Sequence, residues 1–128
     1  MKQNSRPINV GIGDLMGFAW PITAIASITH RVAGVVLFIG IGFALFALEV
    51  SLTDELAFGS LKAMITSPLG KLITWGLLSA LAYHFVAGIK HLIMDTGVGE
   101  TLEGVILAAR VTSFFAAILV VLAAIWVV

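Results

Sequence analysis

His84 stands in the middle of a long apolar stretch of this sequence. It lies 13 positions after Lys71 and six before Lys90, so in a helix it is about 9 Å inward of Lys90. A charged side chain at the centre of a membrane span costs on the order of 2.5 to 3.5 kcal/mol to insert, so this position needs a partner. The imidazole could ligate haem iron, donate a hydrogen bond to a neighbouring helix or relay protons.

Small residues accompany His84 at helical spacing. Gly76, Ala80 and Gly88 recur at intervals of four and share a face with it. Such a shallow face usually lets a neighbouring membrane helix approach closely, and a flat porphyrin would need the same space. The residues alone leave haem ligation and interhelical hydrogen bonding as nearly equal interpretations.

The chain has two further histidines that could partner His84, His30 and His91. His91 is seven residues later on the same face, about 10.5 Å along the helix axis, so the two cannot sandwich one iron. His30 is expected near the cytoplasmic end of the first span, about 9 Å from the level of His84, and suits a haem propionate better. A six-coordinate haem would therefore take its second axial ligand from a partner membrane subunit.

A second polar group occurs on the first span. Thr23, Ser27, His30, Arg31 and Gly34 form one stripe by three- and four-residue spacing. Ser27 and Arg31 supply hydrogen-bond donors suited to the carbonyl oxygens of a quinone. The alternative is an arginine that snorkels to the interface while Ser27 and Thr23 bond back to helix carbonyls.

The remaining polar and aromatic residues have simpler interpretations. The four-residue spacing of His91 and Asp95 favours a local charge pair or helix-end interaction over a role in proton delivery. Trp20, Trp75 and Trp126 lie near predicted membrane interfaces, where indoles are common, and are expected to anchor the chain.

The composition places these residues in a lipid bilayer. Of 128 residues, 60% are hydrophobic and 11% charged, with a mean hydropathy of +1.12. No cysteine is present, which excludes thiolate zinc sites and cysteine-ligated iron–sulfur clusters within this chain. A formal net charge of zero argues against a nucleic-acid partner.

The pattern predicts an all-α membrane protein with three transmembrane helices in a single membrane-anchor domain, residues 1–128. The helices are expected at about 24–49, 69–93 and 104–127, each long enough to cross about 30 Å of hydrocarbon. Ser67 followed by Pro68 predicts the start of the second helix, and Gly97 with Gly99 predicts its end.

The basic residues predict the orientation of the chain. The N-terminus and the loop between helices two and three share one side of the membrane, and this side has five basic residues against two on the other. The positive-inside rule then places a retained N-terminus in the cytoplasm. The five are Lys2, Arg6, Arg31, Lys90 and Arg110, and the two are Lys62 and Lys71.

Three segments of the chain are distinctive together: RPINV, then PITAIASITHRVAG, then LAYHFVAGIKHLIMD. They resemble the cytochrome b subunit of bacterial succinate dehydrogenase, and the resemblance runs from Arg6 to about Val128. The S-x-x-H-R element and the histidine pair followed by aspartate occur together and in the family's order. The chain departs from the mitochondrial members of this family near its N-terminus, where it has NVGIGDL in place of their S-P-H-L segment. This difference favours a bacterial origin.

The resemblance implies specific roles for the polar residues. The position matching His84 is an axial ligand of a b-type haem, and the second axial histidine comes from the other small membrane subunit. Positions matching Ser27 and Arg31 help form the ubiquinone site, and those matching His30 and Arg31 lie near the haem propionates. Thr29 differs from the leucine common in relatives.

The resemblance also implies an assembly in the bacterial inner membrane. A flavoprotein oxidises succinate, and an iron–sulfur protein passes electrons to the membrane, so flavin and iron–sulfur clusters belong to partner subunits. This chain would join a larger helical bundle with a partner anchor subunit, and it has no complete catalytic site of its own. The alternatives are a haem-free structural anchor of a related fumarate reductase and a small transporter subunit.

Overall fold

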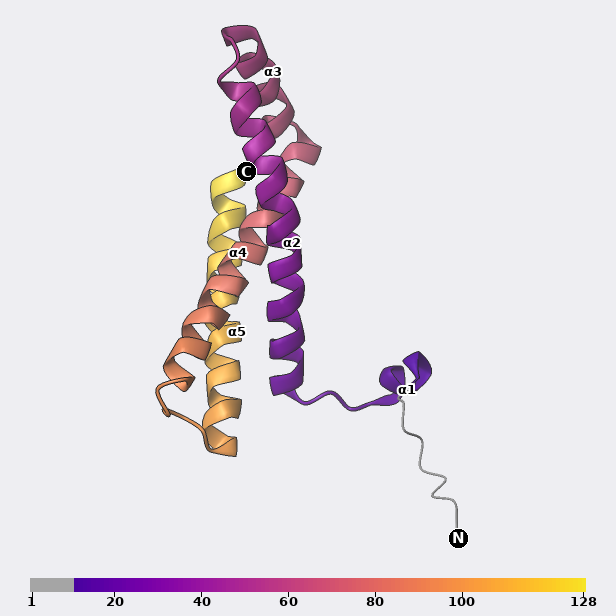
Figure 1. The fold of residues 1–128 in the computed structure, drawn as a ribbon, viewed down its shortest axis with the longest axis vertical. Helices are drawn as coiled ribbons and strands as arrows, with labels where there is room; N and C mark the ends of the chain where they lie inside the picture. The colour runs from indigo at the N-terminus through magenta and orange to yellow at the C-terminus, as the bar shows by residue number, and fades with distance from the viewer. Residues whose placement is uncertain (1–10) are drawn as a thin grey trace.

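The structure is a computed structural model and describes residues 11–128. Lys2, Arg6 and the RPINV segment lie outside the described residues. Within them the chain forms five α-helices (Figure 1), which are α1 (Ile12–Gly17), α2 (Ile22–Ser51), α3 (Glu55–Thr66), α4 (Pro68–Met94) and α5 (Leu102–Val127).

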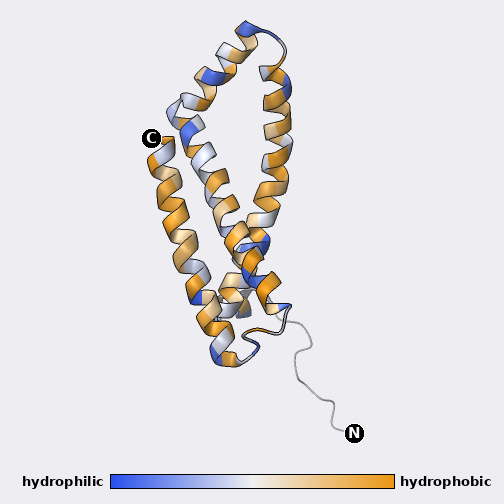
Figure 2. Cartoon of the chain, turned by 90° about the vertical axis from the view of Figure 1, so that its left-hand side faces the viewer, coloured by the Kyte–Doolittle hydropathy of each residue, from blue (hydrophilic) through white to orange (hydrophobic). Residues whose placement is uncertain are grey.

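Three of these helices are long and apolar enough to cross a membrane, namely α2, α4 and α5. They contain 30, 27 and 26 residues, so even the shortest is about 39 Å long and exceeds the hydrocarbon thickness. Figure 2 shows hydrophobic colour along most of their length, whereas α3 and the connections carry more hydrophilic colour. The predicted all-α fold with three transmembrane helices is confirmed.

The helices pack through small side chains. Phe38 is 79% exposed, and most other large apolar residues also point away from the chain's interior. This is the arrangement expected where lipid or another membrane subunit covers the outer surface and close helix approach stabilises the interior. The buried residues are Ala26, Ala33 and Gly40 on α2, Ala87 on α4, and Ala109, Thr112 and Ala116 on α5.

The ends of α4 follow the predicted signals. The Ser67 hydroxyl accepts a hydrogen bond from the Gly70 amide at 3.1 Å, and Pro68 occupies the first helical position. After the helix, Gly97 and Gly99 have φ angles of 85° and 78°, in the left-handed region that favours glycine. Thr101 then caps α5 by accepting from the Gly104 amide.

The α4 helix is central, because it packs against both α2 and α5. The N-terminal ends of α2 and α5 lie at the same end of the bundle as the C-terminal end of α4, and α3 lies at the opposite end (Figure 1). The α3 helix was not predicted, and its 12 residues are too few to span a bilayer. This arrangement places the polar stripe of α2 beside the histidines of α4.

Candidate functional site

The His84 side chain connects α4 to α2 by a hydrogen bond to the main chain. Its Nδ1 atom lies 3.2 Å from the carbonyl oxygen of His30. Because a carbonyl oxygen only accepts hydrogen bonds, Nδ1 must carry the proton. In the neutral ring the lone pair is then on Nε2, which is the tautomer able to ligate a metal through Nε2.

The His30 ring lies between the other two histidine rings. Its centroid is 4.2 Å from that of His84, with an interplanar angle of 23°, and 5.2 Å from that of His91, at 39°. His30 Nε2 is buried and has no hydrogen-bond partner among residues 11–128. Three imidazoles therefore follow one another along the interface between α2 and α4.

The expected depth of His30 was wrong. The rings of His30 and His84 are in contact, whereas the sequence predicted a separation of about 9 Å along the membrane normal. The error came from placing His30 at the end of its span. The α2 helix begins at Ile22, so His30 is eight residues, about 12 Å, inside it, and His84 is ten residues, about 15 Å, from the end of α4.

Two aromatic residues of α4 make similar contacts that the sequence did not predict. The Tyr83 hydroxyl donates to the carbonyl oxygen of Ala26 at 3.1 Å, and the Trp75 indole N–H donates to the carbonyl oxygen of Val120 at 3.1 Å. Trp75 therefore connects α4 to α5, and its interfacial position stays a prediction. The sequence signal for these contacts is a pair of polar aromatic side chains eight residues apart within one span, since a buried Tyr O–H or Trp N–H usually has a hydrogen-bond partner.

The small-residue face of α4 is open in this chain. A Cβ added at Gly76 or Gly88 would meet no heavy atom within 4 Å outside the helix's own nearby backbone. Within the described residues α4 instead contacts α2 through His84, opposite Gly34, and Leu77, opposite Gly40. Space for a further group therefore remains on the stripe that His84 shares with Gly88.

Ser27 and Arg31 directly follow the two carbonyl acceptors on α2. Tyr83 bonds to Ala26, the residue before Ser27, and His84 bonds to His30, the residue before Arg31. Ser27 is half-buried and Arg31 is exposed. Their four-residue spacing puts both on one side of α2, so the two donors can serve a common ligand.

His91 and Asp95 meet at the C-terminal end of α4. Asp95 is the capping residue, and its backbone amide donates to the His91 carbonyl oxygen at 2.9 Å. This backbone bond is the ordinary helix bond between residues four apart, so the charge pair or helix-end interaction of the two side chains stays a prediction.

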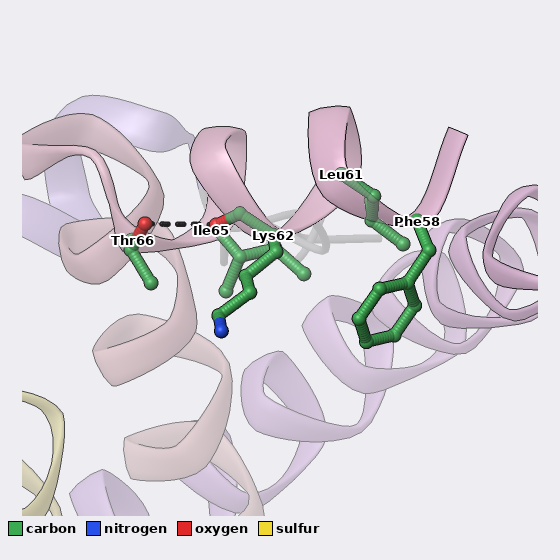
Figure 3. Close-up of a pocket in the computed structure, with 5 residues that line it drawn as sticks. All are labelled: Phe58, Leu61, Lys62, Ile65 and Thr66. Atoms are coloured by element: carbon green, nitrogen blue, oxygen red, sulfur yellow. Dashed lines mark hydrogen bonds between the residues drawn. The ribbon is translucent and has the colours of Figure 1, made fainter. Parts of the chain in front are cut away.

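A groove on α3 lies away from the histidines. Phe58, Leu61, Lys62, Ile65 and Thr66 line a volume of about 190 Å³, and the Thr66 hydroxyl donates to the Lys62 carbonyl oxygen at 2.8 Å (Figure 3). From Pro68, beside α3, to His84 is 16 residues, about 24 Å. In residues 11–128 no three His, Cys, Asp or Glu side chains are grouped to bind a metal ion.

Comparison with known proteins gives a consistent result over nearly the whole chain. Residues 5–127 match the family described as the succinate dehydrogenase/fumarate reductase transmembrane subunit. The chain is 34% identical over 123 residues to the succinate dehydrogenase cytochrome b556 subunit of Coxiella burnetii, covering 95% of this chain and 96% of that protein. It is 33% identical over 103 residues to the subunit of the same name from Paracoccus denitrificans, covering 80% and 77%.

The three apolar helices of the structure agree with a transmembrane subunit, and the matched region includes all of them. The chain therefore belongs to the family of succinate dehydrogenase/fumarate reductase transmembrane subunits.

Proposed function

We propose that this chain is the membrane-anchor subunit of a succinate:ubiquinone oxidoreductase. It forms one membrane domain, residues 1–128, in a bacterial inner membrane, with its N-terminus in the cytoplasm. A flavoprotein and an iron–sulfur protein deliver electrons from succinate, and a second small membrane subunit shares one b-type haem with this chain. Family membership and the cytochrome b556 name of two relatives support this proposal.

His84 is the proposed axial ligand of the haem iron. The observation that carries the assignment is the bond from its Nδ1 to the His30 carbonyl oxygen, which leaves the Nε2 lone pair available. Histidines that ligate metals commonly donate their other ring N–H to a backbone carbonyl or carboxylate. The open stripe at Gly76 and Gly88 provides room beside the ring. The residues present therefore fit a haem.

The second axial ligand is assigned to the partner membrane subunit. The rings of His30 and His84 stack on each other, so these two side chains would not hold one iron between them. His91 is about 10.5 Å further along α4. When bound, the haem supplies a one-electron carrier beside the quinone site.

His30 and Arg31 are proposed to interact with the haem propionates. The buried Nε2 atom of His30 has no hydrogen-bond partner in the described part of the chain, whereas buried polar atoms normally have one, and this supports a role toward a further group. Arg31 keeps its charge at all physiological pH values and can bind a carboxylate through two N–H groups.

Ser27 and Arg31 are proposed to bind the quinone. Both are donors on one side of α2, and a quinone carbonyl gains negative charge as it is reduced. Ser79 and Ser113 use their hydroxyls to bond back to carbonyls four residues earlier, but Ser27 makes no such bond within residues 11–128. Its hydroxyl is therefore free to donate to a ligand.

A haem-free structural anchor is the second candidate, and the same His84 bond favours it, because an interhelical hydrogen bond alone would explain a histidine inside the membrane. Haem content of the purified complex separates the two. His84→Ala is expected to abolish the b-type haem spectrum, and His91→Ala, seven residues along the same face, to retain it. An unchanged haem content in His84→Ala would reject the ligand assignment, and the interhelical hydrogen bond would then be the role of His84.

A further inference from the structure

Gly34 lies directly opposite the His84 ring. A Cβ built at this glycine would be 3.1 Å from Cε1 of His84 and 3.5 Å from its Nδ1. The first distance is shorter than normal van der Waals contact between carbon atoms, which is about 3.5 to 4.0 Å. Any residue larger than glycine would therefore push on the ring edge that carries the donor nitrogen.

The ring has little freedom to move away. One face stacks on His30, and Nδ1 is bonded to the His30 carbonyl oxygen at 3.2 Å. That distance is already at the upper end of the normal range for N–H···O bonds, about 2.7 to 3.2 Å. A displacement of a few tenths of an ångström would carry the bond out of that range.

We propose that Gly34 is a positioning residue that sets the length of the hydrogen bond from His84 Nδ1 to the His30 carbonyl. This inference rests on the proposed haem ligation by His84. Donation from Nδ1 fixes the tautomer and raises the basicity of Nε2 as a ligand. A more basic ligand stabilises ferric over ferrous iron. Gly34 therefore holds the haem at a lower reduction potential than an alanine at this position would.

The test compares substitutions at three glycines of α2 in the assembled complex. Gly34→Ala adds the methyl group that contacts His84. Gly34→Ser adds the same carbon, and its hydroxyl can also bond back to the carbonyl four residues earlier, which is the acceptor that His84 uses. Gly42→Ala is the matched control, because a Cβ there meets nothing within 4 Å.

Gly40→Ala is a second control, for general loosening of the helix pair. A Cβ at Gly40 would lie 2.5 Å from Cδ2 of Leu77, so this variant disturbs the contact between α2 and α4 without touching His84. The measurements are haem content per complex, the optical spectrum of the reduced haem and its midpoint potential by redox titration.

Both Gly34 variants are expected to raise the midpoint potential, Gly34→Ser more than Gly34→Ala, and to lower haem affinity by about tenfold, as loss of an outer ligand contact commonly does. Gly42→Ala and Gly40→Ala are expected to keep the wild-type potential. The inference is overturned if the Gly34 variants keep that potential, or if Gly40→Ala shifts it equally. The proposed function fails separately, if His84→Ala retains its haem.

Discussion

The imidazole of His30 stacks on that of His84 with ring centroids 4.2 Å apart, while the main chain of His30 accepts the hydrogen bond from His84. One residue thus supports His84 in two ways, through its side chain and through its backbone. Only the first depends on the identity of the residue. A substitution at position 30 can therefore separate the two contributions.

His30→Ala is expected to reduce haem content less than His84→Ala does. The alanine variant keeps the carbonyl oxygen at position 30, so the bond that orients His84 persists, while the stacked ring and its Nε2 are lost. Haem per complex, measured by reduced-minus-oxidised spectra, checks this order. Equal loss in both variants would show that the ring, and not the carbonyl, holds His84 in place.

The ends of the helices were predictable from local sequence patterns, whereas contacts between helices were not. The start of α4 at Pro68 and its end before Gly97 follow from capping residues and backbone conformation, which are local properties. The contact between His30 and His84 depends on where two helices lie relative to each other. Counting residues from charged positions could not predict it, because α2 extends eight residues before His30.

The side chains of the candidate site were predictable from the sequence, but their hydrogen-bond partners were not. His84, Ser27 and Arg31 were predictable as site residues because each is polar within an apolar run, where inserting a polar side chain into the membrane costs free energy. The acceptors of Tyr83 and His84 are backbone carbonyls of Ala26 and His30. A carbonyl acceptor has no side-chain signature, so no spacing rule could identify these bonds.

Tyr83→Phe is expected to weaken both the helix pair and quinone binding. The variant removes only the hydroxyl that donates to the Ala26 carbonyl, and an interhelical hydrogen bond of this kind contributes about 0.6 kcal/mol in membrane proteins. Because Ala26 precedes Ser27, the KM for quinone should rise by about two- to threefold while haem content stays at the wild-type level.

Trp75→Phe is the matched control for Tyr83→Phe. It removes a bond of the same length to a backbone carbonyl, but at the interface of α4 with α5. Thermal stability of the complex should fall at least as much, because the smaller ring also leaves space in the packing, with the KM for quinone unchanged. A KM that rises equally in both variants would mean that Tyr83 acts only by stabilising the bundle.

Gly97→Ala is expected to destabilise the turn between α4 and α5 without affecting the haem. Gly97 has a φ of 85°, where a residue with a side chain costs about 1 to 2 kcal/mol. Gly97→Asn should cost less, because asparagine tolerates this conformation better than alanine. Thermal denaturation of the purified complex measures the stabilities of wild type and the two variants. An alanine variant as stable as wild type would contradict the left-handed conformation of Gly97.

Arg31→Lys tests whether Arg31 binds the quinone through its geometry or only through its charge. Lysine keeps the positive charge but loses the planar pair of donors, and it can snorkel to water as arginine does. If Arg31 and Ser27 together hold the quinone carbonyl, kcat/KM for quinone should fall by about tenfold, a loss of about 1.4 kcal/mol. Arg110→Lys, an exposed position on α5, should leave this value unchanged. Wild-type quinone reduction in Arg31→Lys would show that a positive charge suffices at this position, and would restrict donor geometry to Ser27.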